Sequence, residues 1–179
     1  MVVAFSIYRY LTGKYDKDLS GTSTSESASQ SSSSSATESD ATIMAPDFEI
    51  FDADGKSVKL SDFKGKPVVV NFWATWCGWC VKEMPYYEDA IKEYGDDIQF
   101  LMINQTTDGE TQEAAEKFMT DNNFTFDILF DNDLDASIKF GARSLPMSFF
   151  INENGELVET HPGYIEEDVL QEKLQNLLK

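Results

Sequence analysis

The chain is poor in the residues that build metal sites and structural disulfides. It has two cysteines, Cys77 and Cys80, and one histidine, His161, which follows them by more than 80 positions. Protein-bound zinc takes four ligands, and a single Cys-x-x-Cys pair with one distant histidine falls short of that set. We therefore expect no metal site. No second pair of cysteines is available for a structural disulfide bond, so a disulfide between Cys77 and Cys80 is expected to be functional.

Basic residues are also scarce. The sequence has 14 Lys and Arg residues against 32 Asp and Glu residues, which gives a formal net charge of −18. Such a chain repels the phosphates of nucleic acids and of anionic lipids, so we expect neither to bind the surface of the folded domain. Two interpretations of the excess acid stay open: a well-solvated surface, which is the more common case, or an acidic recognition face.

No run of apolar residues reaches the roughly 20 positions that a membrane-spanning helix needs. The apolar stretch from Val2 to Leu11 is short and is interrupted by Arg9, and it lacks the basic residues that precede a signal-peptide core. We interpret residues 1–19 as the C-terminal remnant of a longer membrane anchor. The alternative is a short apolar arm with no membrane role.

Large apolar side chains are missing from the segment that follows. From Ser20 to Thr42 nearly every residue is Ser, Thr, Ala, Glu, Gln, Asp or Gly. A segment of this composition buries too little surface to offset the entropy lost on ordering, so we predict a disordered linker over residues 20–44. Residues 45–179 are of normal size for one compact domain.

Within that domain the apolar residues follow strand and helix periods in alternation. Pro67 to Trp73 is apolar on both faces, as in a buried central strand. The early strands joined by helices are expected to be parallel, and the closing hairpin antiparallel. The fold class is therefore α/β, with a mixed central sheet flanked by helices on both faces. Strands are predicted at 48–51, 58–60, 67–73, 98–104, 126–130, 147–151 and 157–161, and helices at 77–94, 111–122, 134–140 and 167–178.

The two cysteines lie where the buried strand passes into the first of these helices. Cys77 falls at the helix N-terminus, where free N–H groups and the helix dipole favour a thiolate. Cys80 follows one turn later, within reach of a disulfide bond. In such a pair the first thiol attacks a substrate disulfide and the second resolves the mixed disulfide. Half a zinc site and inert structural cysteines are the weaker alternatives.

Several motifs carry a family resemblance that extends from residue 45 to residue 179. The chain resembles the thioredoxin superfamily and, within it, the membrane-tethered TlpA/ResA-type group, whose extra helix–strand segment matches residues 105–131. The motifs are Phe72-Trp73-Ala74-Thr75-Trp76-Cys77-Gly78-Trp79-Cys80 with Pro85 five positions on, Ala45-Pro46-Asp47-Phe48, Leu60-Ser61-Asp62-Phe63-Lys64-Gly65-Lys66, and Glu83-Met84-Pro85. The resemblance implies a thioredoxin fold with an N-terminal β-hairpin and a helix–strand insertion. It also implies an extracytoplasmic reductase, often one that serves cytochrome c maturation.

The resemblance also implies roles for residues near the cysteines. Asn71 occupies the strand position where cytoplasmic thioredoxins keep a buried Asp, and an amide cannot act as a base. Glu83, one turn after Cys80, matches an acidic residue of the reductase group and is the expected acceptor of the Cys80 proton. The alternative is that Glu83 is a solvated helix residue.

The expected substrate-binding residues surround the pair on the surface and on a neighbouring loop. Pro146 falls where the superfamily has a cis-proline, so the resemblance implies that the backbone of Leu145 pairs with a bound substrate strand. An ordinary strand-initiating proline is the alternative. Trp79 departs from the family, which commonly has Pro before the second cysteine. The expected set is Trp76, Gly78, Trp79, Leu145 and Pro146.

The leading functional hypothesis is a tethered reductase of disulfides in extracytoplasmic proteins, such as apocytochrome c or a secreted reductase. It needs no cofactor beyond its redox-active disulfide, acts as a monomer and takes electrons from a thiol carrier in the membrane. A disulfide-introducing oxidase of the DsbA type is the main alternative, since direction depends on redox potential. A peroxidase is disfavoured because Ala74 replaces the Thr that peroxiredoxins place three residues before their cysteine. A non-catalytic binding domain is the remaining alternative.

Overall fold

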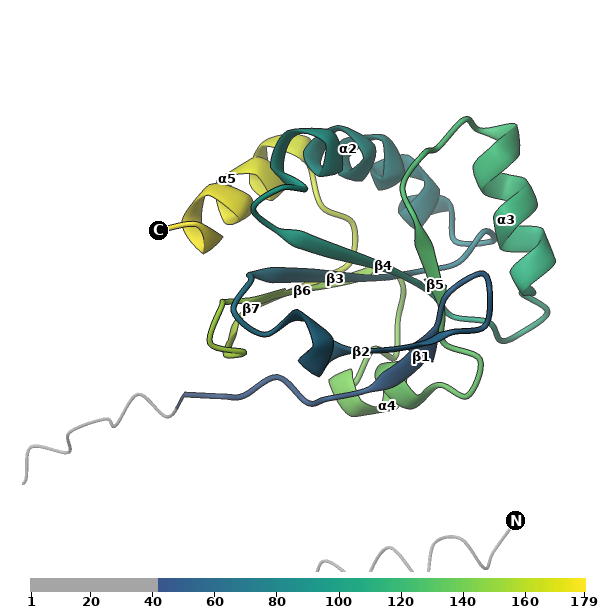
Figure 1. Cartoon of the computed structure of the whole chain (residues 1–179). Coiled ribbons are helices and arrows are strands. Elements are labelled where there is room, and N and C mark those ends of the chain that lie inside the picture. Colours follow the sequence, from purple (N-terminus) through teal and green to yellow (C-terminus); the bar gives the residue numbers. More distant parts are fainter. Residues whose placement is uncertain (1–41) are drawn as a thin grey trace, which may run out of the picture. The chain divides into compact units, whose positions relative to one another are not determined.

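The computed structural model describes residues 42–179, which form one α/β unit (Figure 1). The predicted anchor remnant, residues 1–19, and most of the predicted linker lie outside the described residues. Ile43 and Ala45 already contact the domain: the Ala45 N–H donates to the Gly155 carbonyl at 2.9 Å, and the Leu157 N–H to the Ile43 carbonyl at 2.8 Å. Within residues 42–179, no helix has the length and apolar character needed to cross a membrane.

A seven-stranded mixed sheet with the order β2-β1-β5-β4-β3-β6-β7 forms the centre of the domain. The pairs β3–β4 and β4–β5 are parallel, whereas β3–β6, β6–β7, β1–β2 and β1–β5 are antiparallel. The parallel and antiparallel pairings predicted from the sequence are confirmed. The strands are β1 (Glu49–Phe51), β2 (Ser57–Lys59), β3 (Val68–Trp73), β4 (Gln99–Asn104), β5 (Ile128–Phe130), β6 (Met147–Ile151) and β7 (Leu157–Pro162).

Helices cover both faces of the sheet, as predicted. Helices α2 and α5 lie on one face and α4 lies on the other (Figure 1). A short 3₁₀ helix, η1, leads from the first hairpin into β3, and the insertion supplies α3 and β5. The bounds are η1 (Leu60–Phe63), α2 (Gly78–Tyr94), α3 (Gln112–Asp121), α4 (Asp135–Phe140) and α5 (Glu167–Leu177).

Strand β3 is buried along its whole length and separates two apolar cores. Because side chains alternate across a strand, Val68, Val70 and Phe72 join the core beneath α4, whereas Val69 and Trp73 join the core beneath α2, α3 and α5. Asn71 falls on the second of these faces. A polar side chain is thereby placed in the middle of an apolar layer, directly under α2, where it needs hydrogen-bond partners.

Candidate active site

Cys77 and Cys80 form a disulfide at the start of α2. Their Cα atoms are 5.2 Å apart, within the range that a disulfide can bridge. Cys77 is the N-cap of the helix, and its Sγ accepts a hydrogen bond from the Cys80 N–H at 3.2 Å. Cys80 is fully buried whereas Cys77 is 6% exposed. The outer sulfur is therefore the one that a partner can approach.

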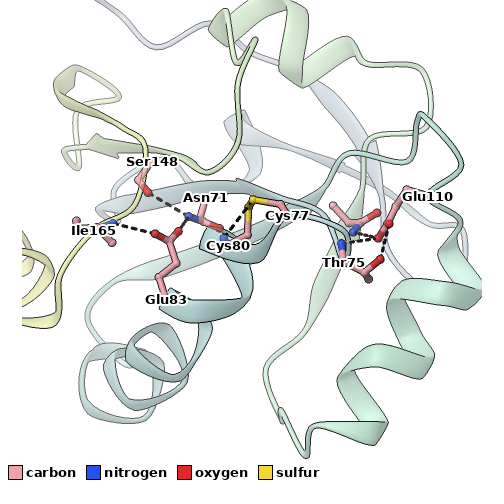
Figure 2. Close-up of a disulfide and its surroundings, with 9 residues drawn as sticks. Asn71, Thr75, Cys77, Cys80, Glu83, Glu110, Ser148 and Ile165 are labelled. Atoms are coloured by element: carbon pink, nitrogen blue, oxygen red, sulfur yellow. Dashed lines mark hydrogen bonds between the residues drawn. A yellow bond between two sulfur atoms is a disulfide. The ribbon is translucent and has the colours of Figure 1, made fainter.

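Behind the disulfide lies a buried carboxylate, Glu83, whose side chain is held from two directions (Figure 2). The Asn71 side-chain amide donates to Glu83 Oε1 at 2.8 Å, and the Ile165 N–H donates to Oε2 at 2.9 Å. Glu83 is fully buried, so the alternative of a solvated helix residue is wrong. Asn71 also donates to Ser148 Oγ at 3.1 Å, and Ser148 is hydrogen-bonded to the hydroxyl of Tyr87 at 2.7 Å.

Burial dominates the electrostatics of Glu83. Desolvation raises the pKa of its carboxyl group from 4.5 to about 7, although the hydrogen bonds from Ile165 and Asn71 act in the opposite direction. A carboxyl group with a pKa near neutrality can both accept and release a proton at physiological pH. Glu83 lies one helical turn after Cys80 on α2, so the two side chains start from the same part of the helix.

The loop before β6 approaches the same site. The Leu145–Pro146 peptide bond is cis, as the family resemblance implied. Pro146 is buried, and Leu145 packs against both apolar cores, including the one that contains the two cysteines. Within residues 42–179, the N–H and C=O groups of Leu145 form no hydrogen bond, whereas the Pro146 carbonyl accepts one from the Gly163 N–H at 2.9 Å.

The two tryptophans next to the cysteines are exposed. Trp76 is 56% exposed and Trp79 is 59% exposed, in contrast to Trp73, which is completely buried. Of the two tryptophans before Cys77, Trp73 thus belongs to the core and Trp76 to the surface around the disulfide. Gly78 is exposed too, and its Cα faces open space rather than a neighbouring group. The disulfide is thus bordered by apolar surface that solvent reaches.

Sequence reasoning missed a second buried carboxylate, Glu110, in the loop between β4 and α3. It accepts hydrogen bonds from the Thr75 N–H at 3.0 Å, the Thr75 hydroxyl at 2.6 Å and the Asn104 side-chain amide at 2.9 Å. These bonds tie the insertion to the residues that lead into Cys77 (Figure 2). In the sequence Glu110 stands among many solvated acidic residues, and nothing in its local pattern distinguishes it from them.

Removing this carboxylate is expected to destabilise the domain. Glu110→Ala leaves the Thr75 N–H and the buried Asn104 amide without their acceptor, and the free energy of unfolding should fall by about 3 kcal/mol. Urea denaturation measures it. The control Glu113→Ala, at an exposed position on α3, should change stability by less than about 0.5 kcal/mol. Equal stabilities of the two variants would show that the Glu110 bonds contribute nothing.

The described residues contain no group of three or more His, Cys, Asp or Glu side chains placed to hold a metal ion. The site itself brings together two sulfur atoms, one buried acid and, at Leu145, a backbone segment with no hydrogen bond to the described residues. This combination of groups can exchange a disulfide with another polypeptide.

Comparison with known proteins agrees with this chemistry. Residues 42–160 match the AhpC/TSA family. Thiol-disulfide oxidoreductase ResA of Bacillus subtilis is 34% identical over 136 residues, which cover 75% of this chain and 74% of ResA. The thioredoxin-like protein YneN of the same organism is 33% identical over 130 residues, which cover 73% of this chain and 76% of YneN.

Solved structures give the same result. The exposed lipoprotein thioredoxin Etrx1 of Streptococcus pneumoniae superposes with a TM-score of 0.65 at 35% identity, covering 74% of this chain and 100% of Etrx1. StoA of Bacillus subtilis has a TM-score of 0.64 at 25% identity, covering 74% of this chain and 98% of StoA. The chain therefore belongs to the AhpC/TSA family of thioredoxin-fold proteins and is a thiol-disulfide oxidoreductase related to ResA.

Proposed function

We propose that this oxidoreductase is a reductase of disulfides in extracytoplasmic proteins. The observation that carries the proposal is the arrangement of Cys77 and Cys80 at the start of α2 with the buried Glu83 one turn behind. In this arrangement the outer sulfur faces the substrate, and the inner sulfur is next to a group that can take its proton. Cys77, Cys80 and Glu83 are the proposed catalytic residues.

The reaction transfers two electrons to the substrate, which also takes up two protons: one is released by Cys80, and the other comes from the solvent, to which Cys77 has already lost its own. The Cys77 thiolate attacks one sulfur of the substrate disulfide, forms a mixed disulfide and releases the other substrate sulfur, which takes up a proton. Cys80 gives its proton to Glu83 and attacks the Cys77 sulfur. The Cys77–Cys80 disulfide forms, and the second substrate sulfur leaves and is protonated. An external dithiol then reduces the enzyme by the same two exchanges in reverse.

The substrate is held by backbone and by surface. In the part of the chain that the structure describes, the N–H and C=O of Leu145 form no hydrogen bond, which suits an extended substrate segment that adds as a short strand. Pro146 keeps this loop against the core, and Trp76, Gly78 and Trp79 supply the exposed surface around the disulfide. Substrate segments of many different sequences can bind in this way, because hydrogen bonds to the backbone do not depend on the side chains of the substrate.

Two features favour the reducing direction. A strongly oxidising pair needs a highly stabilised thiolate. Here the residues between the cysteines, Gly78 and Trp79, carry no charge, and within residues 42–179 only the Cys80 N–H donates to Cys77 Sγ. The ionised form of Glu83 further disfavours a second negative charge nearby. Apart from its position at the helix N-terminus, the Cys77 thiolate therefore has little to stabilise it, which supports the reducing direction.

The cellular setting is inferred from relatives and from the N-terminal sequence. Among the relatives, Etrx1 is an exposed lipoprotein. A Ser-rich segment before the domain suits a tether, with residues 1–19 as part of an anchor. In this setting the electron donor is a membrane thiol carrier, the substrates include apocytochrome c or a secreted reductase, and the enzyme acts as a monomer.

A turbidity assay with insulin tests the proposal. With dithiothreitol as electron source, catalytic amounts of the protein should shorten the lag before insulin precipitates, because Cys77 reduces the interchain disulfides faster than dithiothreitol does. The same preparation should consume no hydrogen peroxide above the dithiothreitol background, since Ala74 occupies the position before the cysteine where a peroxidase would need Thr. An unchanged lag, or rapid loss of peroxide, would contradict the proposal.

A further inference from the structure

A compact group of aromatic side chains and one ammonium group lies beside the disulfide. The rings of Trp79 and Tyr164 have their centroids 5.4 Å apart, and the Lys82 Nζ lies 4.1 Å from the Tyr164 centroid and 5.2 Å from the Trp79 centroid. The Tyr86 hydroxyl is 3.2 Å from the Tyr164 hydroxyl. We call these four residues the Trp79–Tyr164 patch. Its members come from α2 and from the loop before α5.

The ammonium group of Lys82 has no acidic partner. Within residues 42–179, five other lysines form ion pairs with Asp or Glu side chains, but Lys82 forms none. The nearest acidic residue of the loop, Glu166, accepts a hydrogen bond from the Tyr164 hydroxyl at 3.0 Å instead. In a chain with 32 acidic and 14 basic residues, Lys82 is an exposed positive charge, without an ion pair among the described residues, on the helix that begins at the disulfide.

The patch is continuous with the substrate surface proposed above. Trp79 lies between the two cysteines in sequence, and Tyr164 directly precedes Ile165, whose N–H binds the buried Glu83. Cation–π contacts hold the Lys82 nitrogen near the two rings, so less side-chain entropy remains to be lost when a partner binds. Because Trp79 lies between the two cysteines, a substrate segment bound at Cys77 borders the patch at this ring.

We infer that the Trp79–Tyr164 patch binds an acidic side chain of the substrate next to its reacting cysteine. The inference rests on the proposed protein-disulfide reductase function and adds a sequence preference to it. Lys82 pairs with the carboxylate, while Trp79 and Tyr164 pack against the methylene groups of Asp or Glu. Glu166, which is hydrogen-bonded to the Tyr164 hydroxyl, opposes this pairing locally, whereas charges more than about 8 Å away are screened at physiological ionic strength.

The test uses short peptides, each closed by one disulfide and identical except for one residue beside a cysteine. That residue is Glu, Gln or Lys, and it is placed in separate series before and after the cysteine. The full-length protein is reduced with dithiothreitol, freed of excess reagent and mixed with each peptide. Stopped-flow tryptophan fluorescence, which reports oxidation of the Cys77–Cys80 pair, gives the second-order rate constant.

In at least one series the Glu peptide should react about threefold faster than the Lys peptide, the size expected for an exposed charge pair. Lys82→Glu should reverse this order. Lys64→Glu makes the same charge change at an exposed position at the end of η1. This variant should still react faster with the Glu peptide than with the Lys peptide. Tyr164→Ala, which removes the ring nearest to the ammonium group, should reduce the preference.

Two outcomes separate the inference from the function on which it rests. Equal rates for Glu and Lys peptides in both series, or an order that Lys82→Glu does not change, would overturn the inference while leaving the reductase function in place. Failure of the reduced protein to react with any peptide, the Gln peptides included, would overturn the reductase function and the inference together.

Discussion

Replacing Cys77 by serine is expected to lower the rate of insulin reduction to that of dithiothreitol alone, whereas Cys80→Ser should stop the reaction halfway. Without Cys77 no accessible thiol remains, because Cys80 is completely buried. Without Cys80 the first exchange still takes place, but the mixed disulfide has no internal thiol to resolve it. The Cys80→Ser protein should therefore accumulate as a covalent adduct with its substrate.

Mass spectrometry of the two variants after incubation with a disulfide-closed peptide distinguishes the roles. An adduct of one peptide per protein should appear with Cys80→Ser and be absent with Cys77→Ser. An adduct that formed on Cys77→Ser instead would reverse the assignment of attacking and resolving sulfur. The double variant, which has no sulfur to react, serves as the matched control.

Glu83→Gln is expected to slow resolution of the mixed disulfide by at least about 100-fold, the lower end of what a positioned proton acceptor contributes. In the wild-type protein the carboxylate form is the acceptor. Because burial raises the pKa of Glu83 to about 7, that form is scarce below pH 6 and predominates above pH 8. The rate of resolution should therefore rise with pH through an inflection near 7.

The Glu83→Gln protein should lack this inflection, because an amide neither ionises nor accepts the Cys80 proton. Stopped-flow fluorescence between pH 5 and 9 measures both profiles. Glu93→Gln, on the exposed side of the same helix, removes one negative charge at a distance from the site and should retain the wild-type profile. An inflection near pH 7 that persists in Glu83→Gln would show that another group sets the rate.

Much of this fold can be predicted from the sequence because local patterns and sheet geometry agree. The run from Val68 to Trp73, apolar except for Asn71, identifies the central strand, and the cysteine pair followed by Met84 and Tyr87 at helical spacing identifies the helix that follows it. The Asp-Gly and Asn-Gly turns mark the two hairpins. These signals are independent of each other, and each agrees with the α/β order that the structure has.

The parts that the sequence does not reveal depend on contacts between distant segments. The antiparallel pairing of β1 with β5, in which Phe51 opposes Phe130, has no local signature. Tyr164 reaches Lys82 only because the loop before α5 folds over the start of α2. One missed residue did leave a trace: Ser148 is a polar residue within an otherwise apolar strand, and β-sheet register places it opposite Asn71.

In the candidate site, too, some residues have a local sequence signal and others depend on contacts between distant segments. The cysteines could be predicted because a Cys-x-x-Cys pair at a strand-to-helix junction has a specific chemical use. Glu83 could be proposed from its spacing, but its burial follows from the loop that supplies the Ile165 N–H, 82 positions away. Glu110 could not be found at all, because a buried acid and a solvated acid look alike until the Thr75 and Asn104 donors are placed around one of them.

The direction of electron flow is the central claim, and the midpoint potential of the Cys77–Cys80 pair tests it most directly. The protein is equilibrated in thiol–disulfide buffers of known potential, and the oxidised fraction is followed by mass after thiol alkylation or by tryptophan fluorescence. A reductase predicts a midpoint near or below about −220 mV, in the range of thioredoxins and glutaredoxins. A midpoint between about −120 and −180 mV would contradict the account, because a pair with that potential introduces or isomerises disulfides instead of reducing them.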